Sequence, residues 1–192
     1  FDWIRNLDKL MELISGADIA IIDSYLAELP IYLEINKAVK GTVYIDDTMR
    51  LDYPPGVIIN GGVNAESLPY TMDCDHTYLL GLDYTPIRKT FWNIPERVRN
   101  NMFENVLITM GGNDSNGTTF QILDTIWKKY PQLNYHVILG YSSFVKELER
   151  YHEADNIKFY HSLDADEMKD LMLRCDVAIS AAGQTTYEIV RA

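Results

Sequence analysis

The sequence lacks several features that would assign a protein to a functional class at once. Its 192 residues include only 2 cysteines, Cys74 and Cys175, and their positions form no metal-binding spacing. We therefore expect two buried thiols in a reducing cytoplasm. No apolar run reaches the roughly 18 residues of a membrane span, so no transmembrane segment is predicted.

Basic residues are also scarce. The 17 Lys and Arg stand against 28 Asp and Glu, which gives a net charge of −11 at pH 7. A strongly acidic chain repels phosphate backbones, so we expect no nucleic-acid partner. A small anionic ligand is still compatible, because a local pocket can oppose the net field. The shares of apolar residues, 47%, and charged residues, 23%, are typical of a globular protein with a packed core.

Apolar runs alternate with helix-like patterns along the first half. Each short apolar run ends in polar residues, as parallel strands do where they meet a ligand. The predicted strands cover residues 18–23, 42–45, 57–60 and 78–81, the predicted helices residues 3–15 and 28–39, and a long loop residues 61–78. This alternation predicts an α/β fold with a doubly wound sheet.

Residues 83–103 interrupt the alternation, with Pro86 and Pro95 among basic and aromatic residues. We therefore predict two domains, residues 1–95 and 96–192. In the second, strands are expected at 105–110, 135–140, 156–160 and 176–180, and helices at 118–129, 143–151, 164–174 and from 184 onward. Asp164 and Glu167 predict a capping box. The start at Phe1 and the end inside a helical pattern indicate a piece truncated at both ends.

Two loops of the second half are suited to an anion. Residues 110–117 and 180–188 each connect a predicted strand to a predicted helix, where small residues let backbone N–H groups approach a phosphate. The dinucleotide fingerprint GxGxxG and a P-loop lysine are both absent, so the first loop is equally compatible with a tight turn. In the second, Glu188 could instead serve only to favour the helix dipole. Because the loops follow the first and fourth strands of one domain, we expect them to converge on one crevice.

Carboxylates and one histidine stand at other strand ends. Asp23, Asp46 and Asp47 follow two strands of the first half and could bind sugar hydroxyls, orient a base or cap a turn. His161 ends a strand of the second half and could line the crevice. We expect His136 to lie in the core, while His76 falls in the long loop.

Several segments in order resemble the UDP-sugar hydrolases of pseudaminic acid biosynthesis and their relatives in spore coat polysaccharide biosynthesis. The similar segments are 23–25, 45–47, 58–60, 81–84 with 87, 88 and 91, then 110–114 and 180–188. The resemblance implies two Rossmann-like doubly wound domains that face a cleft, of the glycosyltransferase-B type also found in the glycosyltransferase of lipid II synthesis.

The resemblance also implies residue roles. For the sugar, the substrate-binding residues would be Asp23, Tyr25, Asp47, Asn60, Tyr84 and Arg88. For the nucleotide, the binding residues would be Gly111, Gly112, Asn113, His161, Ser180, Gln184, Thr185 and Glu188. Among these, the segment around His161 would lie near uracil, Gln184 and Thr185 would hold the diphosphate, and Glu188 would accept hydrogen bonds from the ribose.

The implied reaction is hydrolysis of a UDP-activated amino sugar, of the UDP-2,4-diacetamido-2,4,6-trideoxy-hexose type, to UDP and free sugar. No cofactor or metal is expected. The family begins with a Gly-x-Gly-His loop whose histidine activates the water, and this sequence has no such motif. We therefore expect the chain to supply binding groups without the catalytic histidine, and to be inactive alone.

Two alternatives are left open by the sequence. One is a UDP-sugar glycosyltransferase of the same fold, and the other is a non-catalytic nucleotide-sugar-binding domain. Either could be fused to, or associated with, other enzymes of cell-surface glycan synthesis. Fold alone does not choose among these activities.

Overall fold

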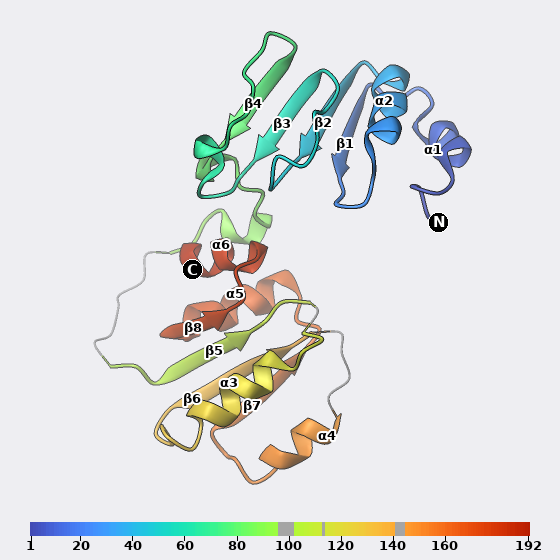
Figure 1. The fold of residues 1–192 in the computed structure, drawn as a ribbon. Coiled ribbons are helices and arrows are strands. Elements are labelled where there is room, and N and C mark those ends of the chain that lie inside the picture. The colour runs from blue at the N-terminus through green and yellow to red at the C-terminus, as the bar shows by residue number, and fades with distance from the viewer. Residues whose placement is uncertain (96–101, 113, 141–144) are drawn as a thin grey trace. The chain divides into compact units, whose positions relative to one another are not determined.

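The computed structural model describes residues 1–95, 102–112, 114–140 and 145–192 (Figure 1). These residues form two compact units, Phe1–Pro86 (unit 1) and Ile87–Ala192 (unit 2). Within them the strands form two four-stranded parallel sheets. The predicted α/β class is therefore confirmed.

The elements follow the predicted alternation closely. Unit 1 contains α1 (Leu7–Ile14), β1 (Ile19–Asp23), α2 (Leu29–Ala38), β2 (Gly41–Ile45), β3 (Gly56–Asn60) and β4 (His76–Leu80), with short 3₁₀ helices η1 (Ala65–Ser67) and η2 (Leu82–Tyr84). Unit 2 contains η3 (Lys89–Phe91), β5 (Asn105–Thr109), α3 (Thr118–Ile126), β6 (Asn134–Leu139), α4 (Val145–Leu148), η4 (Glu149–Tyr151), β7 (Ile157–His161), α5 (Ala165–Arg174), β8 (Val177–Ser180) and α6 (Gln184–Arg191).

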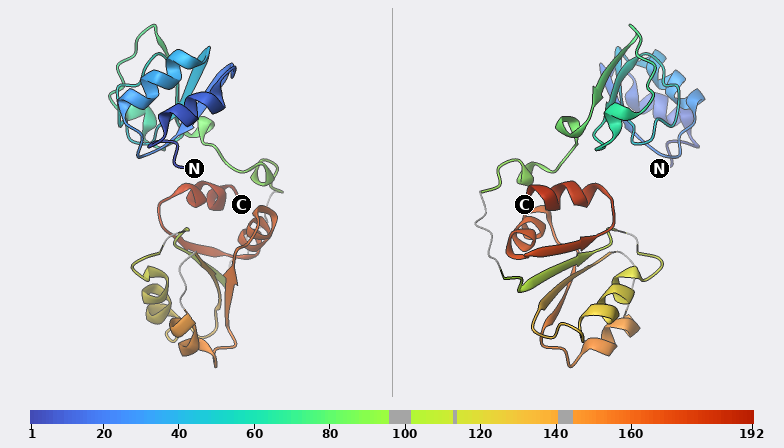
Figure 2. Two further views of the ribbon diagram at one scale, coloured as in Figure 1. Left: turned by 90° about the vertical axis from the view of Figure 1, so that its right-hand side faces the viewer. Right: turned by 60° about the vertical axis from the view of Figure 1, so that its left-hand side comes forward.

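The sheet of unit 1 runs in the order β1-β2-β3-β4. Its two helices, α1 and α2, lie on the same face (Figures 1 and 2). There Ile22, Tyr44 and Ile58 are buried in one cluster with Tyr32 of α2. The rings of Tyr32 and Tyr44 meet edge to face with centroids 5.7 Å apart, a favourable aromatic geometry that adds to the burial.

The opposite face of this sheet is apolar as well. Ile21 stands beside Val43, and Val43 stands beside Val57, because strand partners in register point to the same side. Ile19 and Ile21 are 63% and 72% exposed, and the described residues include no helix over this face. Parallel sheets normally bury both faces, so unit 1 departs here from the expected doubly wound arrangement.

The sheet of unit 2 runs in the order β7-β6-β5-β8 and is covered on both faces. On one face, Ile108 and Val137 pack with Phe120 and Leu123 of α3. On the other, Leu107 and Ile138 pack with α5, in a cluster that Ile189 of α6 also joins. Helices on both faces are the doubly wound arrangement that the alternation predicted.

The division between the units lies earlier in the chain than the predicted division at 95/96. Ile87 and Ile94 pack against the same cluster as Leu107 and Leu171, and Phe91 is fully buried in it. The segment after Pro86 therefore belongs to unit 2 by its packing. Proline positions alone do not reveal this, because the contacts are made with residues far along the chain.

The start of α5 confirms the predicted capping box. The Asp164 carboxylate accepts the backbone N–H groups of Asp166 and Glu167, both at 2.9 Å. In return the Glu167 carboxylate accepts the N–H of Asp164 at 2.9 Å. These bonds satisfy donors that the first turn of a helix leaves without intrahelical partners.

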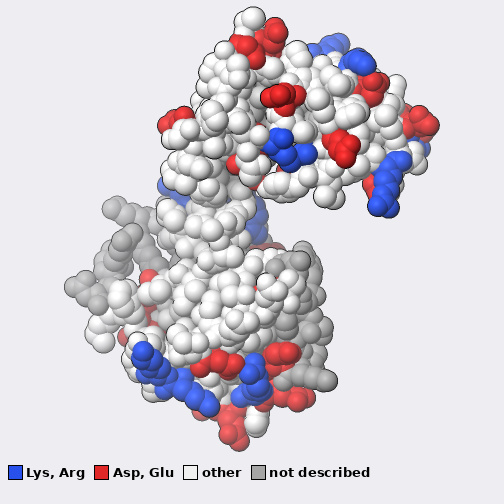
Figure 3. Space-filling model, viewed as in Figure 1, with Lys and Arg blue, Asp and Glu red and all other residues white. Residues whose placement is uncertain are grey.

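Other predictions about single residues met different outcomes. Cys175 is buried but Cys74 is exposed, so the expectation of two buried thiols is wrong for Cys74. His76 begins β4 instead of lying in the loop. None of the helices that the structure describes is long and apolar enough to cross a bilayer. Acidic side chains lie on the surface of both units (Figure 3).

Candidate functional site

The sheet of unit 2 reverses its strand order at β5. From β5 the chain proceeds outward to β6 and β7, and then returns so that β8 pairs with the other side of β5. The loops that follow β5 and β8 consequently start from adjacent strand ends, and Ala181 N–H donates to the Thr109 carbonyl at 3.3 Å. Ligands of open α/β sheets bind beside such a reversal. The two loops therefore start side by side, as their convergence on one crevice requires, and the crevice itself stays a prediction.

Glycines shape the loop after β5. Gly111 has φ of 80°, a conformation that side chains rarely adopt. A Cβ atom on Gly140, at the end of β6, would lie only 2.5 Å from the Gly112 carbonyl oxygen. Gly140 therefore lets the Gly111–Gly112 backbone lie directly against the end of β6. Asn113, also predicted to bind nucleotide, lies outside the described residues.

Asp114 fixes the far end of the same loop. Its buried carboxylate accepts the backbone N–H groups of Thr118 and Thr119, each at 2.8 Å, at the start of α3. Burial alone would raise the pKa of Asp114, but the hydrogen bonds from Thr119 and Thr118 outweigh it and lower this pKa. Asp114 therefore stays ionised and holds α3 in place behind the loop.

The loop after β8 leads into the N-terminus of α6. Gly183 is the residue that precedes this helix and makes no side-chain cap. Thr186 donates from its hydroxyl to the Ala181 carbonyl at 3.0 Å, which closes the loop onto the helix. Gln184 and Thr185 occupy the first turn of α6, where backbone N–H groups and the helix dipole favour an anion. Ser180 ends β8, and its hydroxyl donates to the Ala181 carbonyl at 3.0 Å.

Glu188 lies one turn into α6 and is buried. Both of its carboxylate oxygens accept from the Arg88 guanidinium, at 2.7 Å from Nε and 2.6 Å from Nη2. The Glu188 side chain is 4% exposed and the Arg88 side chain 42%. Hydrogen bonding to Glu188 raises the pKa of Arg88. The structure thus pairs Arg88, which was expected to bind the sugar, with a predicted nucleotide-binding residue of unit 2.

His161, the histidine predicted to bind the nucleotide, lies at the carboxyl end of β7. His161 is exposed there, and Ser162 after it has φ of 52°. His136 lies inside β6, where its Nδ1 is 2.8 Å from the Tyr160 hydroxyl. Burial, and then Lys158 and Arg174, lower the pKa of His136, but the residue is only partly buried instead of lying in the core as predicted.

In unit 1, polar side chains meet at the carboxyl edge of the sheet. Asn60 is fully buried at the end of β3, and its amide donates to the Tyr70 hydroxyl at 3.0 Å. That hydroxyl donates onward to the Asp46 carboxylate at 2.7 Å. Asn60 also accepts the Gly62 N–H at 2.9 Å. Asn60 therefore belongs to a network with Tyr70 and Asp46, and the buried Tyr53 hydroxyl also donates to Asp46 at 3.4 Å.

Asp46 is the central acceptor of this network, and the sequence-based list omitted it in favour of Asp47. It is 3% exposed and also accepts the backbone N–H groups of Thr48 and Arg50, both at 3.3 Å. The sequence does indicate Asp46, because it directly follows β2 at the strand end where binding residues are expected. Tyr70 could not be found in this way, since it comes from a long loop.

The other predicted sugar-side residues are exposed. The Tyr25 hydroxyl donates to the Asp47 carboxylate, and this bond raises the pKa of Tyr25 to about 12. Asp23 is exposed at the end of β1. Tyr84 ends η2 and is 44% exposed. The structure therefore gathers Asp23, Tyr25, Asp47 and Asn60 at the ends of three neighbouring strands, β1, β2 and β3.

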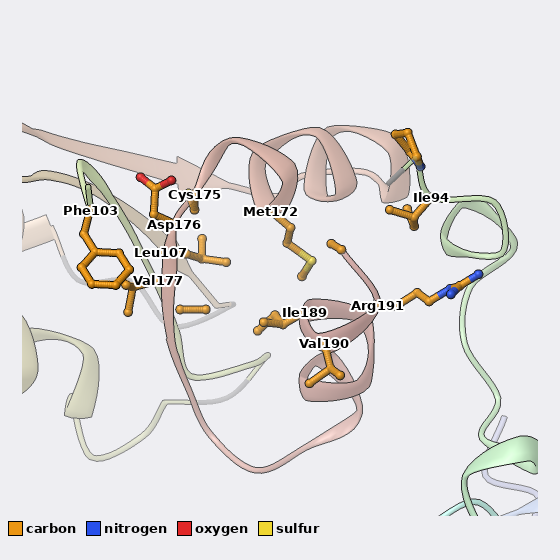
Figure 4. A pocket seen from close by; sticks show the side chains of 13 residues that line it. Ile94, Phe103, Leu107, Met172, Cys175, Asp176, Val177, Ile189, Val190 and Arg191 are labelled. Carbon is orange, nitrogen blue, oxygen red and sulfur yellow. The ribbon is translucent and has the colours of Figure 1, made fainter. Parts of the chain in front are cut away.

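Unit 2 also contains a groove of about 760 Å³ with a mixed polar and apolar lining (Figure 4). Its lining includes Ile94, Leu107, Met172, Val177 and Ile189. The lining starts from the amino end of β8, at Asp176 and Val177, and not from the loop at its carboxyl end. None of the predicted nucleotide-binding residues lines this groove, although Ile189, next to Glu188, does.

Sequence comparison finds curated proteins that resemble nearly the whole chain. No family model matches it. It is 30% identical over 188 residues to the pseudaminic acid cytidylyltransferase and UDP-2,4-diacetamido-2,4,6-trideoxy-beta-L-altropyranose hydrolase of Helicobacter pylori, covering 96% of this chain. It is 27% identical over 200 residues to an uncharacterised protein of Methanocaldococcus jannaschii, covering 97% of this chain. The chain spans 34% and 40% of the lengths of these relatives.

Solved structures with partial similarity are glycosyltransferases. An O-GlcNAc transferase mutant of Thermobaculum terrenum aligns over 95% of this chain and 38% of its own, at 14% identity and a TM-score of 0.47. SnogD of Streptomyces nogalater aligns over 84% of this chain and 42% of its own, at 14% identity and a TM-score of 0.39.

Proposed function

We propose that the chain forms the substrate-binding part of a hydrolase that cleaves a UDP-activated amino sugar of the 2,4-diacetamido-2,4,6-trideoxy-hexose type. The observation that carries the proposal is the reversal of strand order at β5 and β8. It brings two glycine-containing loops together at the carboxyl ends of these strands. The similarity to the Helicobacter pylori protein, whose name includes a UDP-sugar hydrolase, supports this substrate class. The proposed setting is cytoplasmic nonulosonic acid or cell-surface polysaccharide biosynthesis.

In this proposal unit 2 binds the nucleotide. Backbone N–H groups of Gly111 and Gly112, with Gln184 and Thr185 at the start of α6, bind the diphosphate. Such donors need no basic surface, which fits a chain of net charge −11. Glu188 accepts hydrogen bonds from the ribose, and His161 lies near the uracil. The remaining proposed contacts are Asn113 and Ser180.

Unit 1 supplies groups for the sugar. Asp23 and Asp47 accept hydrogen bonds from sugar hydroxyl or amide groups, and Tyr25 orients Asp47 by donating to its carboxylate. Asn60, which is fully buried, contributes from below through its hydrogen bonds to Tyr70 and Gly62. Tyr84, exposed after β4, adds an aromatic surface for the sugar ring.

The chemistry divides between binding and proton transfer. Water attacks the anomeric carbon, the bond from that carbon to the phosphate oxygen breaks, and its electron pair leaves with UDP. Donors around the diphosphate stabilise the departing anion. The printed sequence contains no Gly-x-Gly-His motif, so we propose no general base among its residues and expect binding without turnover.

Binding is tested by calorimetric titration of the 192-residue chain with UDP, UMP and CMP. The proposal requires UDP to bind more tightly than UMP, because the second phosphate gains donors from both loops. Tightest binding of CMP would instead favour the cytidylyltransferase activity that the Helicobacter pylori protein also carries in its name. A Gly41→Ala control in unit 1, for which a Cβ meets nothing within 4 Å, should leave the order unchanged.

The reaction is tested with the natural polypeptide at its native length. It is incubated with the UDP-activated diacetamido sugar, and UDP and free sugar are separated by chromatography. Release of both products without an acceptor supports hydrolysis. Release only after an acceptor is added favours a glycosyltransferase, and tight binding with no release under either condition favours a binding domain.

A further inference from the structure

We propose that Arg88 is a positioning residue that holds the Glu188 carboxylate in place for the ribose of the bound nucleotide. This inference rests on the proposed function and goes beyond it, because it removes Arg88 from the residues that touch the sugar. The two side chains are 100 positions apart in sequence yet form a two-point ion pair.

The geometry of the pair fixes the orientation of the Glu188 carboxylate. Two parallel N–H to oxygen bonds of 2.7 and 2.6 Å fix both the position and the plane of the carboxylate. Glu188 is buried, so without Arg88 its charge would lie uncompensated in a poorly polarisable surrounding. A single ammonium group could supply charge, but it could not define the plane.

Arg88 is itself held by its own segment. Its guanidinium carbon lies 5.3 Å from the centre of the Phe91 ring, which is fully buried. Arg191 of α6 donates to the Phe91 and Trp92 carbonyls, at 3.4 and 2.9 Å. Thr90 donates to the Asp166 carboxylate of α5. The segment that carries Arg88 is thus anchored on α5 and α6 independently of the Glu188 pair.

The arrangement leaves capacity on the carboxylate. An ionised carboxylate offers about four lone-pair sites, of which the two Arg88 bonds use two. Two ribose hydroxyls would use the others. Hydrogen bonds to a charged group away from water are strong, so the accuracy of the carboxylate's placement decides how much the ribose contributes to binding.

The test is the preference for UDP over 2′-deoxy-UDP, measured as the ratio of their dissociation constants by calorimetry. We expect wild type to prefer UDP by roughly tenfold or more, because one hydrogen bond to a charged group is lost without the 2′-hydroxyl. Arg88→Ala should bring the ratio close to one, and Glu188→Gln should do the same. Arg88→Lys, which keeps a charge over Glu188, should retain part of the preference.

Arg191→Ala is the matched control. Arg191 anchors the same segment through two carbonyls but makes neither of the Arg88 bonds to Glu188. We expect it to keep the wild-type ratio, even where both affinities fall, and circular dichroism melting confirms that each variant is folded.

The outcomes separate the two proposals. A wild type that does not bind UDP overturns the proposed function, and this inference with it. A wild type that prefers UDP, combined with an unchanged ratio in Arg88→Ala and Arg88→Lys, overturns the inference alone. Tighter UDP binding by Arg88→Ala would also overturn it, because Arg88 would then block the carboxylate, whose side chain is only 4% exposed.

Discussion

At the scale of single residues, neighbours in sequence have unlike roles. Asp46 and Asp47 both follow β2, but Asp46 is buried and accepts hydrogen bonds within a network, whereas Asp47 is exposed and accepts one from Tyr25. The backbone around Asp46 is unusual as well, since Met49 has φ of 54°. Asp46 accepts N–H groups on both sides of Met49, from Thr48 and Arg50, and so stabilises this turn.

We expect Asp46→Ala to lower the free energy of unfolding of unit 1 by about 2–3 kcal/mol, because the Tyr70 hydroxyl loses a charged acceptor inside the protein. Asp47→Ala, the adjacent control, should change it by about 0.5 kcal/mol or less. Segment-resolved hydrogen exchange on both variants measures the difference. Equal effects would show that the Asp46 network contributes nothing to stability.

His76 gives unit 1 a pH dependence. Burial alone would lower its pKa, but the Asp73 carboxylate, 2.7 Å from Nδ1, and the Tyr53 and Pro54 carbonyls, both 3.1 Å from Nε2, raise it. Both ring nitrogens thus face acceptors, and folding favours the protonated ring. This stabilisation is complete below the ordinary pKa of 6.5 and is lost as the pH rises through the higher folded value.

The amides of β4 should therefore exchange hydrogen more readily at about pH 8 than at about pH 6, after correction for the intrinsic exchange rate. His76→Gln should remove this loss of protection, whereas His152→Gln, on an exposed ring, should not. An identical pH dependence in His76→Gln and wild type would rule out His76 as its source.

At the scale of elements, the strands and helices of unit 2 could be predicted from the sequence, but the close packing of the loop after β5 against the end of β6 could not. Gly140 reads in the sequence only as the end of a strand. In the structure the loop after β5 packs directly against Gly140. A Cβ atom on Gly140 would lie 2.5 Å from the Gly112 carbonyl oxygen and 2.8 Å from the Gly111 carbonyl oxygen.

Gly140→Ala should consequently displace this loop. We expect a loss of about 1–3 kcal/mol in unfolding free energy from overpacking, measured by urea denaturation, and weaker UDP binding by calorimetry. Gly41→Ala in unit 1 meets nothing within 4 Å and serves as the control, with little change in either quantity. Equal losses in the two variants would contradict the packing argument.

At the scale of the whole molecule, the place where the chain divides decides which residues fold together. The proline-rich segment predicted a division at 95/96, but Ile87, Phe91 and Ile94 pack in the core of unit 2. Arg88 lies in the same segment and pairs with Glu188 of α6. The segment from Ile87 to Ile94 is therefore part of unit 2.

Two fragments test this division. Residues 87–192 should unfold cooperatively and keep the UDP affinity of the whole chain. Residues 96–192 should be less stable by at least the roughly 3–5 kcal/mol typical of losing a buried phenylalanine, here Phe91, and should lose UDP binding with Arg88. Thermal unfolding followed by circular dichroism compares them, and equal stability would return the division to the predicted position.

The sequence by itself determined the local elements, because the period of apolar residues and the capping box of Asp164 depend only on near neighbours. It also placed polar residues at the carboxyl ends of strands, where the candidate site lies. Only the tertiary structure decided the order β7-β6-β5-β8, the burial of Asp46 with Tyr70, and the pairing of Arg88 with Glu188. These features join distant parts of the chain, and no local pattern specifies which distant partners meet.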